Sequence, residues 1–340
     1  MTARLGPVES GPALTRNSYI IVKAERELPR GVRRHDDEAV DCLQLRRRMT
    51  VATPSAPAAP VLLLTAGNGP WAWSRTRYEL VDAALDETVT TYPLSEINAH
   101  PRLGHVMRSQ TGEHVTFDFG DTPLELHLGA THEEAGVGSQ LWDASVALSL
   151  FLRSGHLSLS PSSRVVELGA GIGLPSLDLA RRPDHPAHIT LTDARQKLLS
   201  LALQNIDALR QNHASVTAKL DVAPLQWGDA PGDNDVSALA GGVDVAIGSD
   251  ICYEEACVGP LAALLERIAA PLTLLIGPVG RSSYALLRQR LKASSMLRTE
   301  ERLLSLVCNN ADDHQPATVH SAGVHSLLIV RRDDGAASSA

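Results

Sequence analysis

The amino-acid sequence predicts a doubly wound α/β fold, in which a mostly parallel sheet of seven strands carries helices on both faces. Apolar runs of strand length alternate with stretches of helical periodicity from about residue 164 to residue 331. The first of these strands leads into a glycine-rich turn and an apolar helix, which is the opening of a nucleotide-binding unit. The second strand ends in a carboxylate, Asp193.

The glycine turn is the feature around which the other elements are arranged. Residues 164–168 are mostly β-branched or apolar, as expected of a strand buried on both faces. Gly169, Gly171 and Gly173 follow at alternate positions and permit a tight turn with a close approach of the backbone to a ligand. A helix is expected over residues 174–180, with Pro175 tolerated in its first turn. A glycine-rich turn without any ligand is the alternative.

The second strand, residues 188–193, supports a ligand-binding turn. Asp193 follows the glycines at close to the spacing of about 20 residues at which an acid binds both ribose hydroxyls. The first turn is Gly-x-Gly-x-Gly rather than Gly-x-Gly-x-x-Gly. This pattern suits an adenosyl ligand without pyrophosphate better than a dinucleotide.

Three regions are expected along the chain. Residues 1–110 form an N-terminal α/β or irregular extension of unknown role, with a linker near residues 50–60, a helix over 78–86 and a strand over 88–92. Residues 111–332 form the main domain, and residues 333–340 form a disordered tail. The main domain opens with a β-hairpin, residues 114–119 and 124–128, whose apolar and polar residues alternate.

The later elements follow in order. A third strand is expected over residues 216–220, and a fourth over 243–250 ends in Asp250. The remaining strands are expected over 272–276, 301–308 and 326–331, and the remaining helices over 195–210, around 261–268 and over 282–292. The link between the last two strands is too short for a helix, so an antiparallel strand is expected at the end of the sheet.

Composition limits the classes of function. The net charge of −8 and the pI near 5.9 argue against a nucleic-acid-binding protein. The chain has no run of 18 apolar residues and no apolar signal-peptide core near its start, so we expect no membrane span and a cytoplasmic location. Its four scattered cysteines predict neither a disulfide framework nor a metal site. The oligomeric state is left open.

Five motifs in this order resemble the seven-stranded S-adenosylmethionine-dependent methyltransferases, and more narrowly family 16, a group of protein-lysine methyltransferases. They follow the hairpin at residues 138–144 (Gly-Ser-Gln-Leu-Trp-Asp-Ala), 167–174 (Glu-Leu-Gly-Ala-Gly-Ile-Gly-Leu), 191–193 (Leu-Thr-Asp), 225–228 (Leu-Gln-Trp-Gly) and 249–253 (Ser-Asp-Ile-Cys-Tyr). The resemblance covers residues 113–331, implies a Rossmann-like methyltransferase fold, and leaves the first 110 residues without a counterpart.

The resemblance implies a role for ten residues. The cofactor S-adenosyl-L-methionine would be bound by Trp142, Glu167, Gly169, Ala170, Gly171, Asp193, Trp227 and Ser249. Asp250 and Tyr253 match an Asp-x-x-Tyr motif beside the methyl acceptor. Structural alternatives remain for four of them. Trp142 can be a core aromatic, Trp227 a loop anchor, Tyr253 a residue at a helix start, and Asp250 an N-cap.

The implied function is methyl transfer to a lysine amine of a protein substrate. A small-molecule N- or O-methyltransferase and a non-catalytic binding protein of the same fold are the alternatives. Adenine methyltransferases carry Asp-Pro-Pro-Tyr at the corresponding strand end, whereas Ile251 and Cys252 stand here, which lowers the nucleic-acid alternative. Residues 277–281, after the fifth strand, depart from the arginine-rich pattern of some lysine-specific members.

Overall fold

The computed structural model describes residues 20–21, 44–46, 63–65, 75–82, 102–111, 113–129, 137–157, 159–228, 236, 239, 242–310 and 319–333. The chain divides into two compact units, Met1–Ala72 and Trp73–Ala340. The first unit contains a sheet of three short strands: β1 (Ile20–Ile21), β2 (Gln44–Arg46) and β3 (Leu63–Thr65). The linker expected near residues 50–60, the strand expected over 88–92 and residues 334–340 of the expected tail lie outside the described residues. Within the described part of the chain, every helix is too short or too polar to cross a membrane.

The second unit is built on one sheet of eleven strands, in the order β10-β9-β8-β11-β12-β14-β13-β4-β5-β6-β7. The strands are parallel from β10 to β12, and β14 then runs antiparallel to both β12 and β13. The seven expected strands are β8 (Arg164–Leu168), β9 (His188–Asp193), β10 (Lys219–Pro224), β11 (Val245–Ser249), β12 (Leu272–Pro278), β13 (Leu297–Asn310) and β14 (Val319–Arg332).

The expected count of seven strands is therefore too low for the whole sheet. The second edge of β13 pairs with β4 (Arg75–Asp82), and the sheet continues through β5 (Arg102–Thr111), β6 (His114–Asp118) and β7 (Leu124–His127). β6 and β7 pair antiparallel at the positions expected for the hairpin. The domain boundary near residue 110 stays a prediction; β4 precedes it, and β5 extends across it to Thr111, in the same sheet.

The helix expected over residues 78–86 is wrong, because residues 75–82 form strand β4. Thr76, Tyr78 and Leu80 are buried at alternate positions, which is the period of a strand. Their backbone groups pair with β13 on one side and β5 on the other. A local sequence pattern cannot predict pairing with residues more than 200 positions away in the chain, such as that of Asp82 with Leu304.

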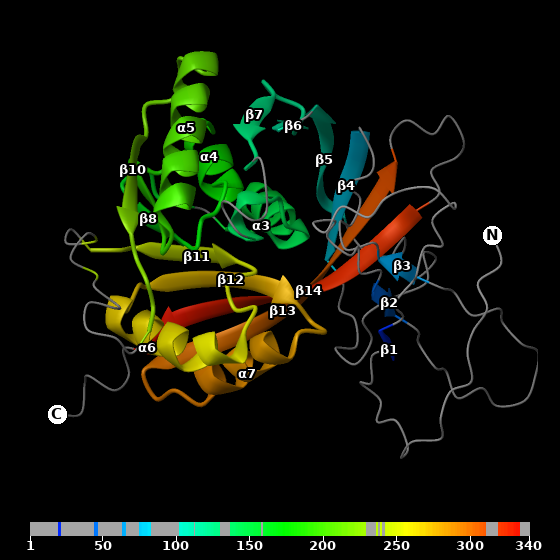
Figure 1. The fold of residues 1–340 in the computed structure, drawn as a ribbon. Helices are drawn as coiled ribbons and strands as arrows, with labels where there is room; N and C mark the ends of the chain where they lie inside the picture. The colour runs from blue at the N-terminus through cyan, green and yellow to red at the C-terminus, as the bar shows by residue number, and fades with distance from the viewer. Residues whose placement is uncertain are drawn as a thin grey trace, which may run out of the picture. The chain divides into compact units, whose positions relative to one another are not determined.

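Helices cover both faces of the sheet, as Figure 1 shows: α3, α4 and α5 lie on one side of β11 and β12, and α6 and α7 lie on the other. Their bounds are α3 (Asp143–Arg153), α4 (Leu174–Ala180), α5 (Gln196–Asn212), α6 (Val258–Ile268) and α7 (Ser282–Lys292), with short 3₁₀ turns η2 (Val137–Ser139) and η4 (Glu255–Cys257). The predicted doubly wound α/β architecture is present.

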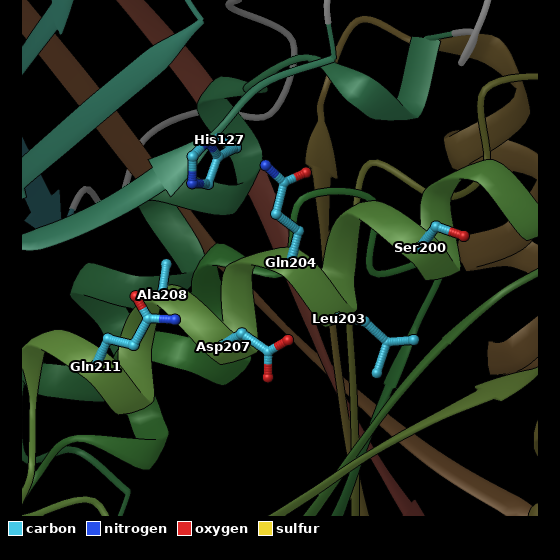
Figure 2. Close-up of a pocket in the computed structure, with 7 residues that line it drawn as sticks. All are labelled: His127, Ser200, Leu203, Gln204, Asp207, Ala208 and Gln211. Carbon is cyan, nitrogen blue, oxygen red and sulfur yellow. The ribbon is translucent and has the colours of Figure 1, made fainter.

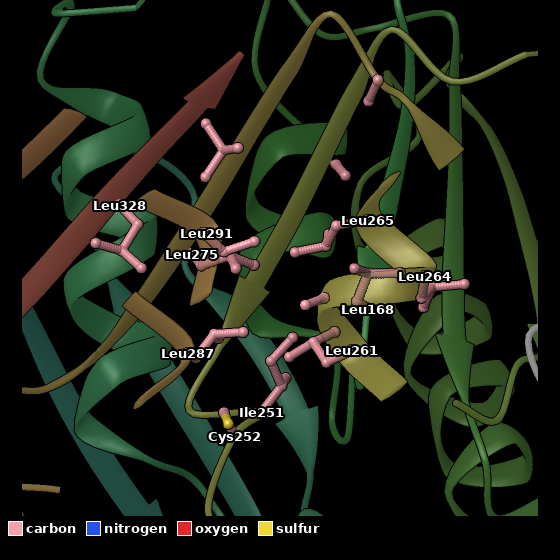
Figure 3. Packing of buried hydrophobic residues seen from close by; sticks show 14 of the residues in the cluster. Leu168, Ile251, Cys252, Leu261, Leu264, Leu265, Leu275, Leu287, Leu291 and Leu328 are labelled. Carbon is pink, nitrogen blue, oxygen red and sulfur yellow. The ribbon is translucent and has the colours of Figure 1, made fainter. Parts of the chain in front are cut away.

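An apolar core fixes α6 and α7 against the sheet. Figure 3 shows leucines of these helices meeting Leu168, Leu275 and Leu328 of strands β8, β12 and β14. Ile251 and Cys252, which follow β11, are buried in the same core. The chain therefore leaves β11 with its next residues anchored, and Asp250 lies between the strand and this anchor.

The buried carboxylate of Asp178 links helices α3 and α4, and its arginine partners also bind the loop of the β6–β7 hairpin. The Asp178 side chain has no exposed surface and accepts hydrogen bonds from Arg153, Arg181 and Arg182 at 2.6–3.2 Å. Arg153 and Arg181 also pair with Asp121, in the loop between β6 and β7. These contacts join α3, α4 and the hairpin loop in one charged network.

Candidate functional site

The glycine turn between β8 and α4 has the backbone that its sequence predicts. Gly169, Gly171 and Gly173 have φ values of 59°, 54° and 81°, in the left-handed region that side chains disfavour. A Cβ added at Gly171 would lie 2.5 Å from the carbonyl oxygen of Gly138, in η2. The Ala170 amide donates to the Thr192 carbonyl at 2.8 Å, which fixes the turn against β9.

Asp193 lies beside this turn at the end of β9. Its Oδ2 accepts a hydrogen bond from the Gly171 amide at 3.2 Å, and its Oδ1 accepts one from the Arg195 amide at 3.1 Å. Burial raises the pKa of Asp193, although these amide hydrogen bonds act in the opposite direction. A carboxylate can accept about four hydrogen bonds, so Asp193 keeps capacity for hydroxyl groups.

Glu167 is buried within β8, below the turn. Its Oε2 accepts a hydrogen bond from the Ser176 amide at 3.2 Å, in the first turn of α4. Burial raises the pKa of Glu167 to about 7, and the nearby Asp193 adds to the rise. These contacts give Glu167 a structural role at the start of α4, and its predicted contact with a cofactor stays a prediction.

The two predicted tryptophans approach the turn from different elements. Trp142 is 38% exposed, and its Nε1 donates to the Val137 carbonyl of η2 at 2.9 Å. It is therefore not the core aromatic that was the alternative. The ring of Trp227 is partly buried against the core, and its Cη2 would lie 3.3 Å from a Cβ added at Gly169. Trp227 thus fits both a loop anchor and a wall of the site.

The acceptor motif begins where β11 ends, at Ser249. Asp250 has a φ of 55°, which is uncommon for a residue with a side chain and a mark of backbone strain. Its amide donates to the Ile276 carbonyl of β12 at 2.8 Å. The N-cap alternative for Asp250 is wrong, since the N-cap positions of η4 and α6 are Glu254 and Cys257. Tyr253 is 46% exposed.

The carboxylate of Asp250 is paired with an arginine that the sequence did not single out. Arg281 Nη2 donates to Asp250 Oδ2 at 3.1 Å, and Nη1 lies 3.1 Å from Oδ1. Burial nevertheless raises the pKa of Asp250 to about 6, and the negative charge of Asp143 contributes to the rise. Arg281 precedes α7, just after β12, so its place at the carboxyl edge of a strand was the available signal.

Asp143 and two residues behind it were also missed. Burial raises the pKa of Asp143 to about 6, while Arg108 and a hydrogen bond from Tyr78 lower it. Tyr78 of β4 and Arg108 of β5 are each 1% exposed. Asp143 follows Trp142 within the quoted motif, but Tyr78 and Arg108 come from strands that the sequence did not predict.

The predicted residues thus converge on one edge of the sheet. β8, β9 and β11 are neighbours in the sheet, and the glycine turn, Asp193 and Asp250 follow their carboxyl ends. A separate hollow of about 400 Å³ lies along α5, where Figure 2 shows His127, Leu203, Gln204 and Asp207 among its lining residues. None of the predicted site residues lines that hollow.

Comparisons with known proteins show which proteins this chain is similar to. A family model described as lysine methyltransferase matches residues 122–283. Protein N-lysine methyltransferase METTL21A of Mus musculus is 33% identical over 162 residues, which are 48% of this chain and 68% of the relative. The METTL21A protein of Danio rerio is 30% identical over 151 residues, which are 44% of this chain and 64% of the relative. This chain therefore matches about two thirds of the length of either relative.

A solved structure, the precorrin-6y C5,15-methyltransferase of Geobacter metallireducens, overlays with a TM-score of 0.41. It is 11% identical, and the overlay covers 61% of this chain and 97% of that one.

Proposed function

Because this chain belongs to the lysine methyltransferase family, we propose that it is an S-adenosylmethionine-dependent enzyme that methylates a lysine side chain of a protein substrate. The observation that carries the proposal is the position of the Asp193 carboxylate, which accepts a hydrogen bond from Gly171 in the glycine turn. Asp250 follows β11, which neighbours β8 in the same sheet. A nucleoside-binding acid and an amine-binding acid thus lie at the ends of β9 and β11, the two strands that flank β8 in one sheet.

The cofactor half of the site has residues of suitable chemistry. Asp193 would accept hydrogen bonds from the ribose hydroxyls, and the partly exposed Trp142 and Trp227 would supply apolar walls. Gly169, Ala170 and Gly171 form the turn, with Ser249 at the end of the neighbouring strand. When bound there, S-adenosylmethionine supplies a methyl group that its sulfonium already activates.

The acceptor half has to bind an amine in its neutral form. Removing the proton from a lysine of pKa near 10.4 at pH 7.4 costs about 4 kcal/mol. A buried anionic Asp250 would accept hydrogen bonds from the amine and orient its lone pair, while the exposed ring of Tyr253 would pack beside the aliphatic stem. The protein thereby contributes mainly position, in a site from which water is partly excluded.

We propose the same class of substrate and the same location that the sequence predicts. The substrate is a protein rather than a nucleic acid, since the net charge is −8, and the location is the cytoplasm.

Two substitutions test the division of roles. Full-length protein is incubated with methyl-labelled S-adenosylmethionine and a cell lysate, and cofactor affinity is measured by calorimetry. Asp250→Ala should abolish labelling of protein while leaving cofactor affinity within about twofold. Asp193→Ala should weaken cofactor binding by about tenfold or more, because a charged hydrogen-bond acceptor is lost. Loss of cofactor affinity in Asp250→Ala would contradict the assignment of cofactor binding to Asp193 and amine binding to Asp250. If only small molecules in the lysate became labelled, the substrate would be a small molecule rather than a protein.

A further inference from the structure

Arg281 forms a two-pronged contact with the acid of the acceptor site. We infer that Arg281 is a positioning residue, whose guanidinium fixes the orientation of the Asp250 carboxylate and keeps it an anion for the incoming amine. This inference rests on the proposed function for its link to methyl transfer. The effect of Arg281 on the Asp250 carboxylate is a property of the protein alone and can be measured without a substrate.

The geometry of the pair favours a fixed carboxylate. Arg281 Nη2 donates a hydrogen bond to Asp250 Oδ2 at 3.1 Å, and Nη1 lies 3.1 Å from Oδ1 as an ion-pair contact; Oδ1 accepts no hydrogen bond from any residue in the described part of the chain. An arginine presents both of its Nη groups in one plane, so the hydrogen bond and the ion-pair contact together restrict the orientation of the Asp250 carboxylate. The Arg281 amide donates to the Pro278 carbonyl at 3.2 Å, so the backbone that carries the guanidinium is itself held at the end of β12. The Asp250 side chain is 11% exposed, so solvent screens the pair only in part.

The surroundings explain why Asp250 needs a cation. Burial and the negative charge of Asp143 both favour the protonated form of Asp250, and Arg281 is the group that opposes them. Burial also raises the pKa of Cys252, to about 12, and the pKa of Tyr284, so both of these neighbours are neutral near pH 7. Even with Arg281 in place, the pKa of Asp250 is about 6.

The Asp143 carboxylate, whose negative charge acts on Asp250 against that of Arg281, is itself held in place. Asp143 is the first residue of α3, which packs on β4 and β5. Tyr78 and Arg108 of those strands are buried and interact with the Asp143 carboxylate. Asp143 Oδ1 is buried and accepts no hydrogen bond from any residue in the described part of the chain. The two neighbours of Asp250 therefore have opposite charges and should shift its titration in opposite directions.

Carbon-13 NMR of the carboxyl groups tests this directly in the full-length protein. The Asp250 resonance is assigned by its loss in Asp250→Asn, and its titration is followed in four variants. Arg281→Gln should raise the pKa of Asp250 by about one pH unit or more, and Asp143→Asn should lower it. Arg281→Lys should give an intermediate value, because it keeps the charge and loses the fork.

Arg288→Gln is the matched control, since Arg288 lies on the same helix α7, pairs with Glu301 at 2.8 Å and is not among the charges that shift the pKa of Asp250. It should leave the titration of Asp250 unchanged. Circular dichroism of each variant checks that the fold is retained. If Arg281→Gln folds and leaves the pKa of Asp250 unchanged, or if Arg288→Gln shifts it equally, the inference is wrong.

Methyl transfer to a lysine-containing peptide library connects the titration to function. In Arg281→Gln the acidic limb of the rate profile should move to higher pH in step with the NMR titration, and the rate should partly recover at alkaline pH. If Arg281→Gln transferred methyl groups at the wild-type rate with an unchanged pH dependence, the inference would be wrong and the proposed function would stand. A shifted titration together with no transfer by the wild type would instead overturn the proposed function and keep the assignment of Arg281 to Asp250.

Discussion

At the scale of single residues, burial governs the chemistry of the carboxylates in this sheet. Glu167, Asp143 and Asp250 have pKa values raised to about 7, 6 and 6, and desolvation is the largest cause in each. Asp250 has an arginine partner at 3.1 Å, whereas Glu167 accepts a hydrogen bond from the neutral Ser176 amide. A folded protein that holds such groups binds more protons than its unfolded chain between the two pKa values.

Glu167 should therefore destabilise the folded protein as the pH rises. Its pKa is raised from 4.5 to about 7 on folding, so stability is lost between about pH 4.5 and pH 7 and stays lower above that range. Glu167→Gln keeps an acceptor for the Ser176 amide without the charge. We expect the variant to match the wild type near pH 4.5 and to exceed it at pH 8 by on the order of 3 kcal/mol in the free energy of unfolding.

Urea unfolding of both proteins at several pH values measures this difference. Taking the difference between the two proteins cancels the contributions of Asp143 and Asp250, whose pKa values are raised as well. A difference that does not change with pH would show that Glu167 is not neutralised by folding.

At the scale of elements, ion pairs and packing join helices to the extended sheet. The buried Asp178 accepts hydrogen bonds from three arginines and ties α3 to α4, and Arg153 and Arg181 extend this network to the hairpin loop at Asp121. The arginines also contact Phe119, whose ring lies 4.2 Å below the guanidinium carbon of Arg153. These contacts hold α3, whose first residue is Asp143, beside the site.

Removing Asp178 should be strongly destabilising, because the remaining arginines would be left partly buried without their main anion. We expect Asp178→Ala to lower the free energy of unfolding by about 3 kcal/mol or more. Asp221→Ala is the control, because its side chain is 42% exposed and pairs with Lys219 and His188 at the edge strand β10. That change should have an effect of about 1 kcal/mol or less. Equal losses in the two variants, measured by urea unfolding, would contradict a special role for Asp178.

At the scale of the whole molecule, one sheet joins the predicted methyltransferase strands to strands that precede them in the sequence. β4 pairs with the last seven residues of the β13 ladder, from Leu304 to Asn310, and β5 pairs with β4 in turn. The same two strands carry Tyr78 and Arg108 toward Asp143. Residues 75–82 and 102–111 therefore contribute to the sheet and to the surroundings of the site.

Two truncated chains test this contribution. A chain that begins at Trp73 keeps the whole eleven-stranded sheet, and we expect it to unfold cooperatively and to bind cofactor. A chain that begins at Glu113 lacks β4 and β5 and leaves one edge of β13 unpaired, so we expect a lower melting temperature and a tendency to aggregate. Thermal unfolding and size-exclusion chromatography measure both effects. Equal melting temperatures would show that β4 and β5 are dispensable for the fold.

Much of the candidate site follows from local sequence. The expected strand over residues 188–193 and the helices over 174–180 and 282–292 have the bounds observed for β9, α4 and α7. Strand β10 begins at Lys219 rather than at residue 216, because its pairing with β9 sets the register and the apolar pattern does not. The helix expected over residues 78–86 failed for the same reason, since β4 exists through partners distant in the chain.

The sequence by itself determined the left-handed glycine turn, the acid that ends β9 and the alternation of strands and helices along the chain. Each of these depends on residues close together in the chain, whose backbone preferences and apolar spacing are local properties. Only the tertiary structure decided the pairing of Arg281 with Asp250 and the burial of Tyr78 and Arg108 behind Asp143. Charges and hydrogen bonds between distant segments depend on the distance between them in space, and the folded sheet alone sets that distance.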